Sequence, residues 1–543
     1  MSNQNRTIYG GKVNREKPIN FVFNGKSYIG YQGDTLASAL LANDVHLIGR
    51  SFKYHRARGI LTAGSEEPNA IVQLGLGART EPNIRATEVE LYEGLEASSQ
   101  NCWPSVNFDI GAMNNFLSRI FPAGFYYKTF KWPPSMWLFY EHFIRKAAGL
   151  GQSPTAKNPD RYEQKFYYTD ITIVGGGISG LLAALGAGRS GCKVLLIDEN
   201  PELGGYLLDY NFSINEKDGK KWLKKIIEEL NGLANVVILN RTTAMGYYDY
   251  NYLTALEKVT NHHVEFSSTL PRERYWRIRS KKVILAQGAF ERPLVFADND
   301  RPGIMMASAG QKYLSRYGVL PGKSVVLFTN NDHAYLTAFE FVEKGAKVTV
   351  VDTRDLLNAR ISEKCKSLNI TVFKSYSVIK TYGDKKVNRI EIQQVDKNQN
   401  QLTGEVENIH TDCVLMSGGW NPAVQLFSQS RGKLKYDLKI NTFVPDKIIE
   451  NQKIIGSNNG QFNLQENLNE SFEAGIAAAN ELNFNSVEKV NWTGKEEIEF
   501  THSDVEPYML GKKKVTKGSK HFIDFQNDVT AACLLYTSPS PRD

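Results

Sequence analysis

The sequence predicts an α/β protein in which two Rossmann-like, FAD/NAD(P)-binding units follow an N-terminal β-grasp, ferredoxin-like domain. Three observations predict this fold. Residues 171–198, "ITIVGGGISGLLAALGAGRSGCKVLLID", read as strand, glycine turn, helix and strand. Residues 322–354 repeat this order, and such alternation is typical of a parallel sheet covered by helices. Residues 19–45 read as strand, turn, strand and helix, the order in which a β-grasp domain begins.

The composition is that of an ordinary globular protein that is too long for a single core. The 543 residues are 41% hydrophobic and 23% charged, and a chain of this length divides into several domains. A net charge of +7 without a block of Lys or Arg predicts no nucleic-acid partner. The first residues are polar and no run of about 18 apolar residues occurs, so we expect neither a secretory leader nor a membrane span.

The five cysteines lie far apart and form no C-x-x-C pair. Free thiols in this pattern favour a reducing compartment, so we expect a cytoplasmic protein. The spacing also excludes a compact cysteine-based metal site and the redox pair of a disulfide reductase, and we predict no metal site. The cysteines are Cys102, Cys192, Cys365, Cys413 and Cys533.

Changes in pattern divide the chain into six parts. We interpret the aromatic connector as an ordered segment packed on its neighbours, with a partner interface as the alternative because aromatic and Arg residues are enriched at interfaces. The last residues carry no periodic pattern and read as a non-native tail. The parts are 1–105 (β-grasp domain without cluster ligands), 106–166 (connector), 167–300 with 408–485 (first dinucleotide-binding domain), 301–407 (second, degenerate unit), 486–532 (approach to a further domain) and 533–543 (tail).

The β-grasp domain lacks the ligands of an iron–sulfur cluster. A plant-type cluster needs four thiolates in a C-x4-C-x2-C…C pattern, and no cysteine occurs between Met1 and Asn101. The loop in question reads "GRSFKYHRARGILTAGSEEPNA" instead. We expect its Arg50, Arg56 and Arg58 to solvate the loop, with contact to a partner or an anion as the alternative.

The first glycine motif predicts a dinucleotide site. Gly175 permits the tight turn, Gly177 lets the backbone approach a pyrophosphate, and Gly180 lets the helix pack on the strand. The helix N-terminus offers free N–H donors to the phosphates. Asp198 ends the next strand and is expected to accept hydrogen bonds from both adenosine ribose hydroxyls, which disfavours a 2′-phosphate.

The continuation is typical of the two-dinucleotide flavoprotein plan but departs from it at one position. "PELGG" supplies the glycine pair that ends in Gly205, and "KKVILAQG" predicts a return strand that ends near Gly288. In flavin enzymes of this plan an Asp commonly follows the glycine of the last strand, whereas Ser457 follows Gly456 here. The missing acid weakens the case for FAD and leaves NAD as a serious candidate for the same site.

The second unit has lost its glycines. Thr329, Asn330, Asn331 and Ala334 occupy the turn, and side chains there crowd the approach of a pyrophosphate. We predict a structural relic of a nucleotide domain, with a working site as the alternative, in which Asp352 would meet a ribose. His333 at the start of the helix is interpreted as a cap or a surface residue rather than a base.

Several longer strings resemble the alpha-subunit family of heterotetrameric sarcosine oxidases. They are "FKYHRARGI", "GFYYKTFKWP", "GGGISGLLAA", "LLIDENPELGG", "AQGAFERPLVFADNDRPGIM", "SGGWNPAVQLFSQSRGKL" and "HFIDFQNDVTAA". The resemblance covers the chain to about Ala532. It implies a cluster-less ferredoxin-like domain, a two-dinucleotide domain and, beyond this chain, an aminomethyltransferase-like domain that binds tetrahydrofolate.

The resemblance also implies the cofactors and the site. NAD occupies the first nucleotide site without taking part in turnover, while FAD and a covalently attached FMN belong chiefly to the beta subunit; gamma and delta subunits complete the complex. Asn458 and Asn459 stand where the family has small residues. No catalytic residue is predicted, and the predicted cofactor-binding residues are Gly175, Gly176, Gly177, Gly180, Asp198, Glu199, Asn200, Gly205, Tyr206, Ala244, Gly288 and Ser457.

The reaction implied by the resemblance is the oxidative demethylation of sarcosine. The FAD of the beta subunit oxidises sarcosine, FMN passes the electrons to oxygen to give peroxide, and tetrahydrofolate captures the imine as 5,10-methylenetetrahydrofolate; without folate, formaldehyde is released. Two alternatives stay open from the residues alone. The first is a self-sufficient FAD-dependent amine or opine dehydrogenase. The second is an assembly subunit with an empty nucleotide site.

Overall fold

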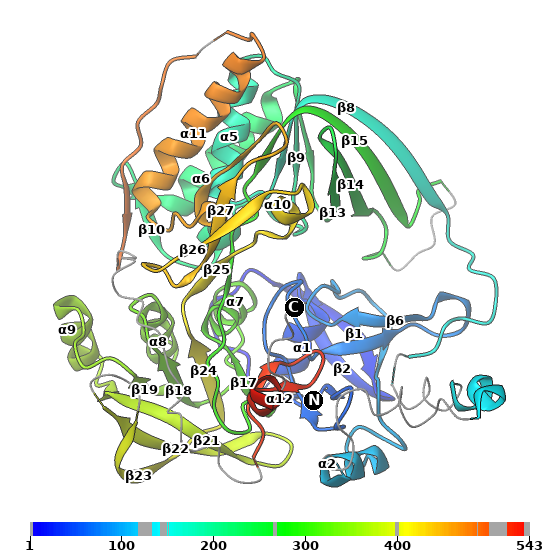
Figure 1. Cartoon of the computed structure of the whole chain (residues 1–543), viewed down its shortest axis with the longest axis vertical. Helices are drawn as coiled ribbons and strands as arrows, with labels where there is room; N and C mark the ends of the chain where they lie inside the picture. The colour runs from blue at the N-terminus through cyan, green and yellow to red at the C-terminus, as the bar shows by residue number, and fades with distance from the viewer. Residues whose placement is uncertain are drawn as a thin grey trace.

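The computed structural model describes residues 4–117, 133–141, 149, 151–263, 269–396, 401–485, 487–498 and 519–536. Figure 1 shows two nucleotide-type units and the N-terminal domain arranged around a common centre. The predicted α/β class is confirmed, with a β-grasp sheet followed by two largely parallel sheets. Residues 118–132, 142–148 and 150 of the aromatic connector and the end of the predicted tail lie outside the described residues.

The N-terminal domain is a five-stranded sheet in the order β2-β1-β7-β5-β6, packed on one helix. The turn between the first two strands is formed by Asn24 and Gly25, both with positive φ, as a tight hairpin requires. Thr35 caps the helix in a capping box with Ser38. The elements are β1 (Asn14–Phe23), β2 (Lys26–Gln32), α1 (Leu36–Ala42), β3 (Gly49–Arg50), β4 (Ala57–Arg58), β5 (Ile71–Leu74), β6 (Glu81–Arg85), β7 (Leu95–Ser99) and α2 (Met113–Leu117).

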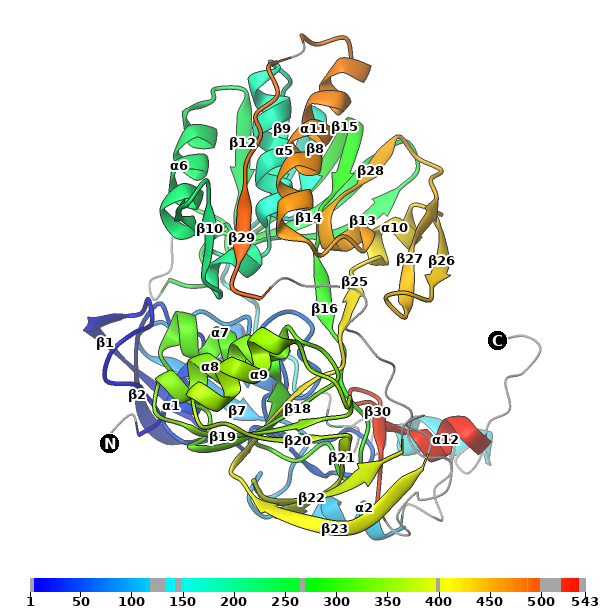
Figure 2. The same ribbon diagram turned by 90° about the vertical axis from the view of Figure 1, so that its left-hand side faces the viewer.

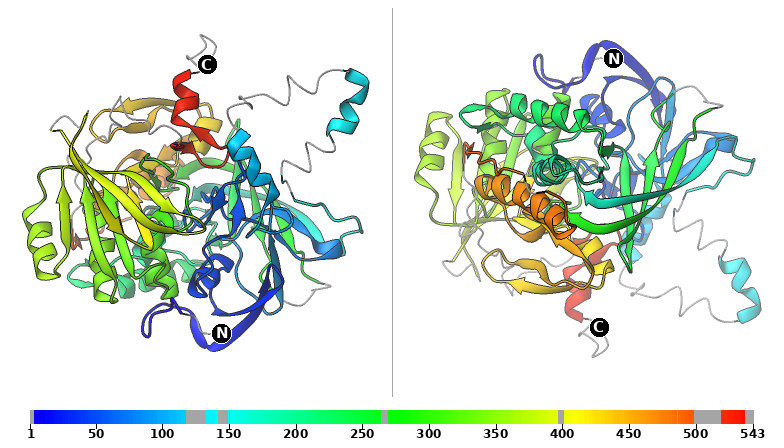
Figure 3. Two further views of the ribbon diagram at one scale, coloured as in Figure 1. Left: turned by 90° about the horizontal axis from the view of Figure 1, so that it is seen from below. Right: turned by 90° about the horizontal axis from the view of Figure 1, so that it is seen from above.

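The first unit is built on the parallel strands β12, β9, β8, β15 and β28, and an antiparallel pair, β14 and β13, extends the sheet from β15. The helices α5 and α11 pack on each other against this sheet; α11 is orange in Figure 3. The elements are β8 (Tyr162–Val174), α5 (Ile178–Arg189), β9 (Val194–Ile197), α6 (Gly219–Gly232), β12 (Val236–Leu239), β13 (Thr242–Tyr248), β14 (Tyr252–Lys258), β15 (Glu273–Leu285), β28 (Gln452–Ile454) and α11 (Leu464–Glu481).

The second unit is a parallel sheet in the order β17-β24-β18-β19-β20, next to a three-stranded antiparallel sheet. The elements are β17 (Ile304–Met306), α7 (Ala307–Tyr317), β18 (Ser324–Thr329), α8 (Ala334–Glu343), β19 (Lys347–Asp352), α9 (Ala359–Ser367), β20 (Thr371–Lys374), β21 (Tyr376–Gly383), β22 (Val387–Val395), β23 (Leu402–His410) and β24 (Cys413–Ser417).

One predicted domain boundary changes. The prediction returns the chain to the first unit at residue 408, but β24 hydrogen-bonds to β17 and β18 and therefore completes the second sheet. The chain crosses between the units on a two-stranded ribbon of β16 (Ala289–Glu291) and β25 (Trp420–Pro422), which Figure 2 shows between them. The remaining elements are β10 (Phe212–Ile214), β11 (Lys217–Asp218), α10 (Gln425–Gln429), β26 (Lys433–Asp437), β27 (Thr442–Lys447), β29 (Gly494–Glu496), β30 (Phe522–Asp524), β31 (Val529–Thr530) and α12 (Ala531–Tyr536).

The arginines of the N-terminal loop are structural rather than solvating. Arg58 is 1% exposed and forms ion pairs with Asp300, at 2.9 Å, and with Asp528. Arg56 also pairs with Asp300, at 2.6 Å, and Arg50 donates to the backbone carbonyl of residue 106. The segment around β30 therefore folds back onto the N-terminal domain, and buried cations in these positions are compensated by carboxylates far along the chain.

Candidate dinucleotide site

A cavity of about 260 Å³ lies where β8, β9 and β15 end, the edge at which open α/β sheets bind ligands. Eight predicted residues line it together, although they come from five separate stretches of the chain. Side chains of the second unit and of the interdomain ribbon close it. The predicted residues in its wall are Gly175, Gly177, Asp198, Asn200, Gly205, Tyr206, Gly288 and Ser457.

The glycines of the turn serve two different purposes. At Gly175, with φ +107°, an added Cβ would lie 2.2 Å from the Ala286 carbonyl oxygen, and at Gly180 it would lie 1.8 Å from the Gly175 oxygen. These two positions need glycine for close backbone packing. At Gly177 and Gly288 an added Cβ would meet no atom of the described residues within 4 Å, so their bare backbone faces the cavity and can be approached by a ligand.

Asp198 accepts a hydrogen bond from the glycine turn and also lines the cavity. Its carboxylate accepts hydrogen bonds from the Gly176 backbone N–H at 2.5 Å and from the backbone and side-chain nitrogens of Asn200 at 2.7 and 3.0 Å. Burial raises the pKa of Asp198, while these N–H donors favour the carboxylate form. A carboxylate accepts about four hydrogen bonds, so one position is left for a ribose hydroxyl rather than the two that the sequence predicts.

Four predicted residues do not line this cavity. The Gly176 N–H faces Asp198, and Gly180 is covered by the turn. Ala244 pairs with Ala255 inside the antiparallel ladder of β13 and β14. Glu199 turns toward the N-terminal domain, where it accepts a hydrogen bond from the Ser65 hydroxyl at 2.9 Å and lines a neighbouring cavity of about 390 Å³.

An aromatic wall, of which the sequence predicts Tyr206 but not its neighbours, closes one end of the cavity. The Tyr206 hydroxyl is hydrogen-bonded to Nε2 of His333 at 2.6 Å, and Tyr206 stacks on Tyr210 with ring centroids 4.4 Å apart. His333 also meets Trp420 edge-on at 5.7 Å. His333 occupies the N-cap position of α8 without a side-chain capping hydrogen bond to the described residues. At 5% exposure it is not the surface residue that was the other interpretation. Burial lowers its pKa to about 4, which keeps the ring neutral.

The edge of the cavity near Ser457, where flavin enzymes of this plan carry an Asp, is polar. Asn467 is 5% exposed, and its side-chain oxygen has no hydrogen-bond partner among the described residues. The same is true of the side-chain oxygen of Gln287 within those ranges, and both residues line the cavity. With its amide oriented to suit its neighbours, Asn458 donates to the Ala423 carbonyl at 3.0 Å and accepts from the Gln287 N–H at 3.3 Å. Asn458 is thus buried behind the wall and bonded to the backbone of Gln287. The two acceptors of Gln287 and Asn467 fit a ligand rich in hydroxyl or amide groups.

The corresponding end of the second unit is filled by its own side chains. Asp352 is 0% exposed, accepts a hydrogen bond from the Tyr335 hydroxyl at 2.8 Å and pairs with Arg354 at 2.9 Å. Arg354 in turn pairs with Asp332 at 2.8 Å. The Asn331 side chain donates to the Ser417 hydroxyl at 3.0 Å. The carboxylate that could meet a ribose is thus already engaged.

The described part of the chain brings no further redox or metal group to the cavity. Its five cysteines are free thiols and none of them lines the cavity. No cluster of three His, Cys, Asp or Glu side chains suited to a metal ion occurs among the described residues. Within the same ranges, no helix combines the length and the apolar character that crossing a bilayer requires.

Comparisons with known proteins agree with this architecture. The model "Pyridine nucleotide-disulphide oxidoreductase" matches residues 169–447, just over half of the chain, and "2Fe-2S iron-sulfur cluster binding domain" matches 16–102. The chain is 43% identical to the alpha subunit of sarcosine oxidase from Rhizobium meliloti (strain 1021), over 96% of its length and 51% of that protein. It is 29% identical to an opine oxidase subunit of Agrobacterium tumefaciens (strain Ach5), over 34% of its length and 37% of that protein.

The crystal structure of L-proline dehydrogenase from P. horikoshii shares the fold, with a TM-score of 0.58, 18% identity and coverage of 89% of this chain and 77% of that one. The chain spans about half the length of its sarcosine oxidase relative. The iron–sulfur cluster named in the second model does not fit the residues present, because Cys102 is the single cysteine within 16–102. The chain belongs to the pyridine nucleotide-disulphide oxidoreductase family and resembles the alpha subunit of sarcosine oxidase along nearly its whole length.

Proposed function

We propose that the chain is the N-terminal part of the alpha subunit of a sarcosine oxidase complex, and that it holds NAD across its glycine turn without oxidising substrate itself. The observation that carries this proposal is the contrast between the two units. A two-dinucleotide reductase passes electrons between cofactors on both units. Here the first unit has an open cradle, at Gly177 and Gly288, whereas the second is occupied by Tyr335 and Arg354.

The residues of the first unit supply binding and orientation. The N-terminus of α5 directs free backbone N–H groups toward the cavity, where its partial positive charge favours a pyrophosphate. Asp198 fixes the turn through Gly176 and retains one acceptor position for a ribose hydroxyl. The acceptors of Gln287 and Asn467 line the remainder of the path.

The far end of the cavity is suited to enclosing a flat ring. NAD, when bound, carries a nicotinamide that can exchange hydride. Tyr206, His333 and Trp420 surround the corresponding end, and the neutral His333 is engaged by the Tyr206 hydroxyl. The wall offers aromatic packing and excludes water, and the described residues bring no thiol pair to the ring.

The complete reaction belongs to the proposed complex. A beta subunit with FAD and covalent FMN would oxidise sarcosine to glycine with formation of peroxide, in a complex with gamma and delta subunits. Formaldehyde, or 5,10-methylenetetrahydrofolate when tetrahydrofolate is present, would carry the methyl carbon. The similarity to a sarcosine oxidase over 96% of the chain supports this assignment, as does the shared fold of an amino-acid dehydrogenase. We further propose a cytoplasmic location, in keeping with five free cysteines.

A second candidate is an FAD-dependent amine or opine dehydrogenase subunit. The match to the opine oxidase of Agrobacterium tumefaciens favours it, and so do the unsatisfied oxygens of Gln287 and Asn467, which the hydroxyls of a ribityl chain could meet.

One experiment separates the two candidates. The purified chain is denatured and the released ligand is identified by mass spectrometry, while the visible spectrum of the native protein is recorded before and after sarcosine is added. We expect NAD, no flavin band and no spectral change. A flavin that bleaches on addition of sarcosine would refute the proposal in favour of the second candidate, and an empty cavity would leave an assembly subunit.

A further inference from the structure

The loop between β4 and β5 lies within the domain matched by the cluster-binding model and contains no cysteine. The C-x4-C-x2-C pattern places ligands at positions separated by five and three residues. Thr62, Glu67 and Ala70 have this separation in the loop between β4 and β5. The family model places this loop within a cluster-binding domain. The middle one of these three positions is therefore a carboxylic acid, Glu67.

The Glu67 carboxylate is the centre of the loop. Its side chain is buried, with 0% exposure. One oxygen accepts from the backbone N–H groups of Leu61 at 2.9 Å and Thr62 at 2.6 Å, and the other from those of Asn69 at 2.7 Å and Ala70 at 2.9 Å. The Thr62 hydroxyl adds a contact at 3.2 Å. Among the described residues no basic side chain forms an ion pair with Glu67, so these donors are what compensates its burial.

Convergent backbone N–H groups form a nest that binds anions, and such nests hold both phosphates and iron–sulfur clusters. We propose that the Glu67 carboxylate replaces the cluster as the anion around which this loop folds, and that the loop so held positions Glu199 beside the nucleotide site. The second half rests on the proposed function.

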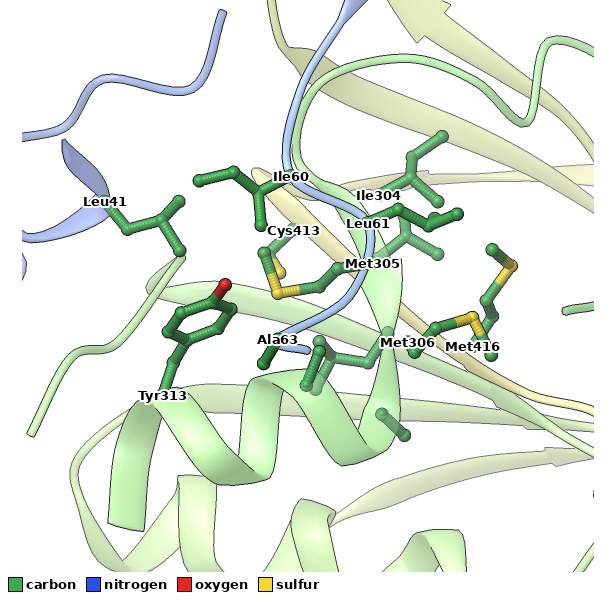
Figure 4. Packing of buried hydrophobic residues seen from close by; sticks show 14 of the residues in the cluster. Leu41, Ile60, Leu61, Ala63, Ile304, Met305, Met306, Tyr313, Cys413 and Met416 are labelled. Carbon is green, nitrogen blue, oxygen red and sulfur yellow. The ribbon is translucent and has the colours of Figure 1, made fainter. Parts of the chain in front are cut away.

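The outer side of the loop joins both nucleotide units. Figure 4 shows Leu61 and Ala63 packed against Met305, Met306 and Tyr313 of the second unit. The Tyr313 hydroxyl donates to the Thr62 carbonyl at 2.9 Å. The backbone N–H of Met306 donates to the Leu61 carbonyl at 2.8 Å.

One further polar contact holds the loop to α7 of the second unit, and another extends it to the edge of the first unit. The Lys312 ammonium donates to the Ala63 carbonyl at 2.8 Å, and the Ser65 hydroxyl donates to the Glu199 carboxylate at 2.9 Å. Glu199 follows Asp198 directly and shares its cavity wall with Asn200, the residue that also lines the dinucleotide cavity. A loop that is ordered by Glu67 therefore fixes the orientation of a carboxylate in the cavity next to the dinucleotide site.

The first test measures the loop itself. In Glu67→Gln the amide nitrogen faces N–H donors, so hydrogen exchange of the backbone N–H groups at 61, 62, 69 and 70 should accelerate by about tenfold or more. The matched control is Glu66→Gln, whose side chain is exposed in the same loop. Unchanged exchange in Glu67→Gln would overturn the first half of the proposal.

A second measurement needs no variant. Iron and acid-labile sulfide are assayed in the full chain produced with an excess of iron, and we expect neither in stoichiometric amount. A [2Fe–2S] cluster at one per chain would overturn the proposal even where Glu67→Gln fails to fold.

The third test measures the positioning role by titrating nucleotide-stripped protein with NAD. Loss of one hydrogen bond in Ser65→Ala should weaken binding about fivefold, Glu67→Gln should weaken it at least as much, and Glu66→Gln should leave it unchanged. If the wild type binds NAD and both variants match it, the positioning role is wrong while the proposed function stands. If the wild type binds no dinucleotide, the proposed function and the positioning role both fail. The hydrogen-exchange measurement still decides whether Glu67 orders the loop.

Discussion

The two nucleotide-type units share their topology but differ in what occupies the ends of their strands. In the first, Gly177 and Gly288 leave backbone facing an open cavity, and Asp198 retains an acceptor position. In the second, Tyr335 and Arg354 engage Asp352. The difference teaches that a strand–turn–helix unit binds a nucleotide only where side chains are missing, because a Cβ or a guanidinium in the turn takes the place of the ligand.

The largest expected effect comes from filling the open turn. Gly177→Val should abolish NAD retention, weakening binding by at least about 100-fold, because Gly177 lines the cavity. Its φ of −70° and the absence of described atoms within 4 Å of the added Cβ should leave the melting temperature of the nucleotide-free variant close to that of nucleotide-free wild type. Gly232→Val on α6, where an added Cβ also meets nothing, is the matched control. NAD binding equal to wild type would show that the ligand lies elsewhere.

Removing a buried side chain from the strand ends of the second unit should lower the free energy of unfolding without changing NAD affinity. Asp352→Ala leaves Arg354 and the Tyr335 hydroxyl without their shared partner in a buried site. Breaking a buried pair in this way costs about 3 kcal/mol of unfolding free energy, measured by denaturant titration, while NAD affinity stays constant. Asp355→Ala, at an exposed position nearby, serves as control. A change in NAD affinity without loss of stability would contradict the assignment of a relic.

His333 connects the two units and makes stability depend on pH. Its folded pKa of about 4 lies below the ordinary value near 6.5. Between these two pH values His333 is therefore protonated in the unfolded chain but neutral in the folded chain. Stability should therefore fall between about pH 6.5 and 4, by roughly 3 kcal/mol in total. His333→Gln should flatten this dependence, and the exposed His410→Gln should not. Equal slopes in the wild type and His333→Gln would refute the burial of a neutral ring.

The smallest effect is expected at Asp198. Asp198→Ala should weaken nucleotide retention by about 1.5–3 kcal/mol through the loss of charge-assisted hydrogen bonds. Part of this loss comes from the turn, since the Gly176 N–H loses its acceptor. Retention by size-exclusion followed by quantification of released NAD measures it. Retention equal to wild type would count against the site.

The sequence predicts the features that depend on backbone geometry. The glycine turn at Gly175, the hairpin at Asn24 and the order of strands follow from local residue preferences, and the structure has them. Oxidoreductase membership and the likeness to the alpha subunit of sarcosine oxidase are confirmed by the comparisons.

The features that sequence reasoning missed depend on contacts between distant segments. His333 reads as a cap from its position before α8, but packing of the two units buries it against Tyr206, 127 residues away. The same holds for Arg58, which local composition places in solvent and which the later part of the chain buries. Glu199 faces a cavity next to the dinucleotide cavity and Ala244 lies in the ladder of β13 and β14, because adjacency along a strand end does not decide which way a side chain points.

The pairing of Arg58 with Asp528 has a consequence for biosynthesis. The two residues are 470 positions apart, so the N-terminal domain emerges from the ribosome long before the carboxylate that covers its buried guanidinium is translated. Domains usually mature in order of synthesis, yet this one cannot reach its final packing until almost the whole of the present sequence is available. Nascent chains stalled before residue 528 should therefore expose the Arg58 loop to proteases that no longer cut it in the finished protein.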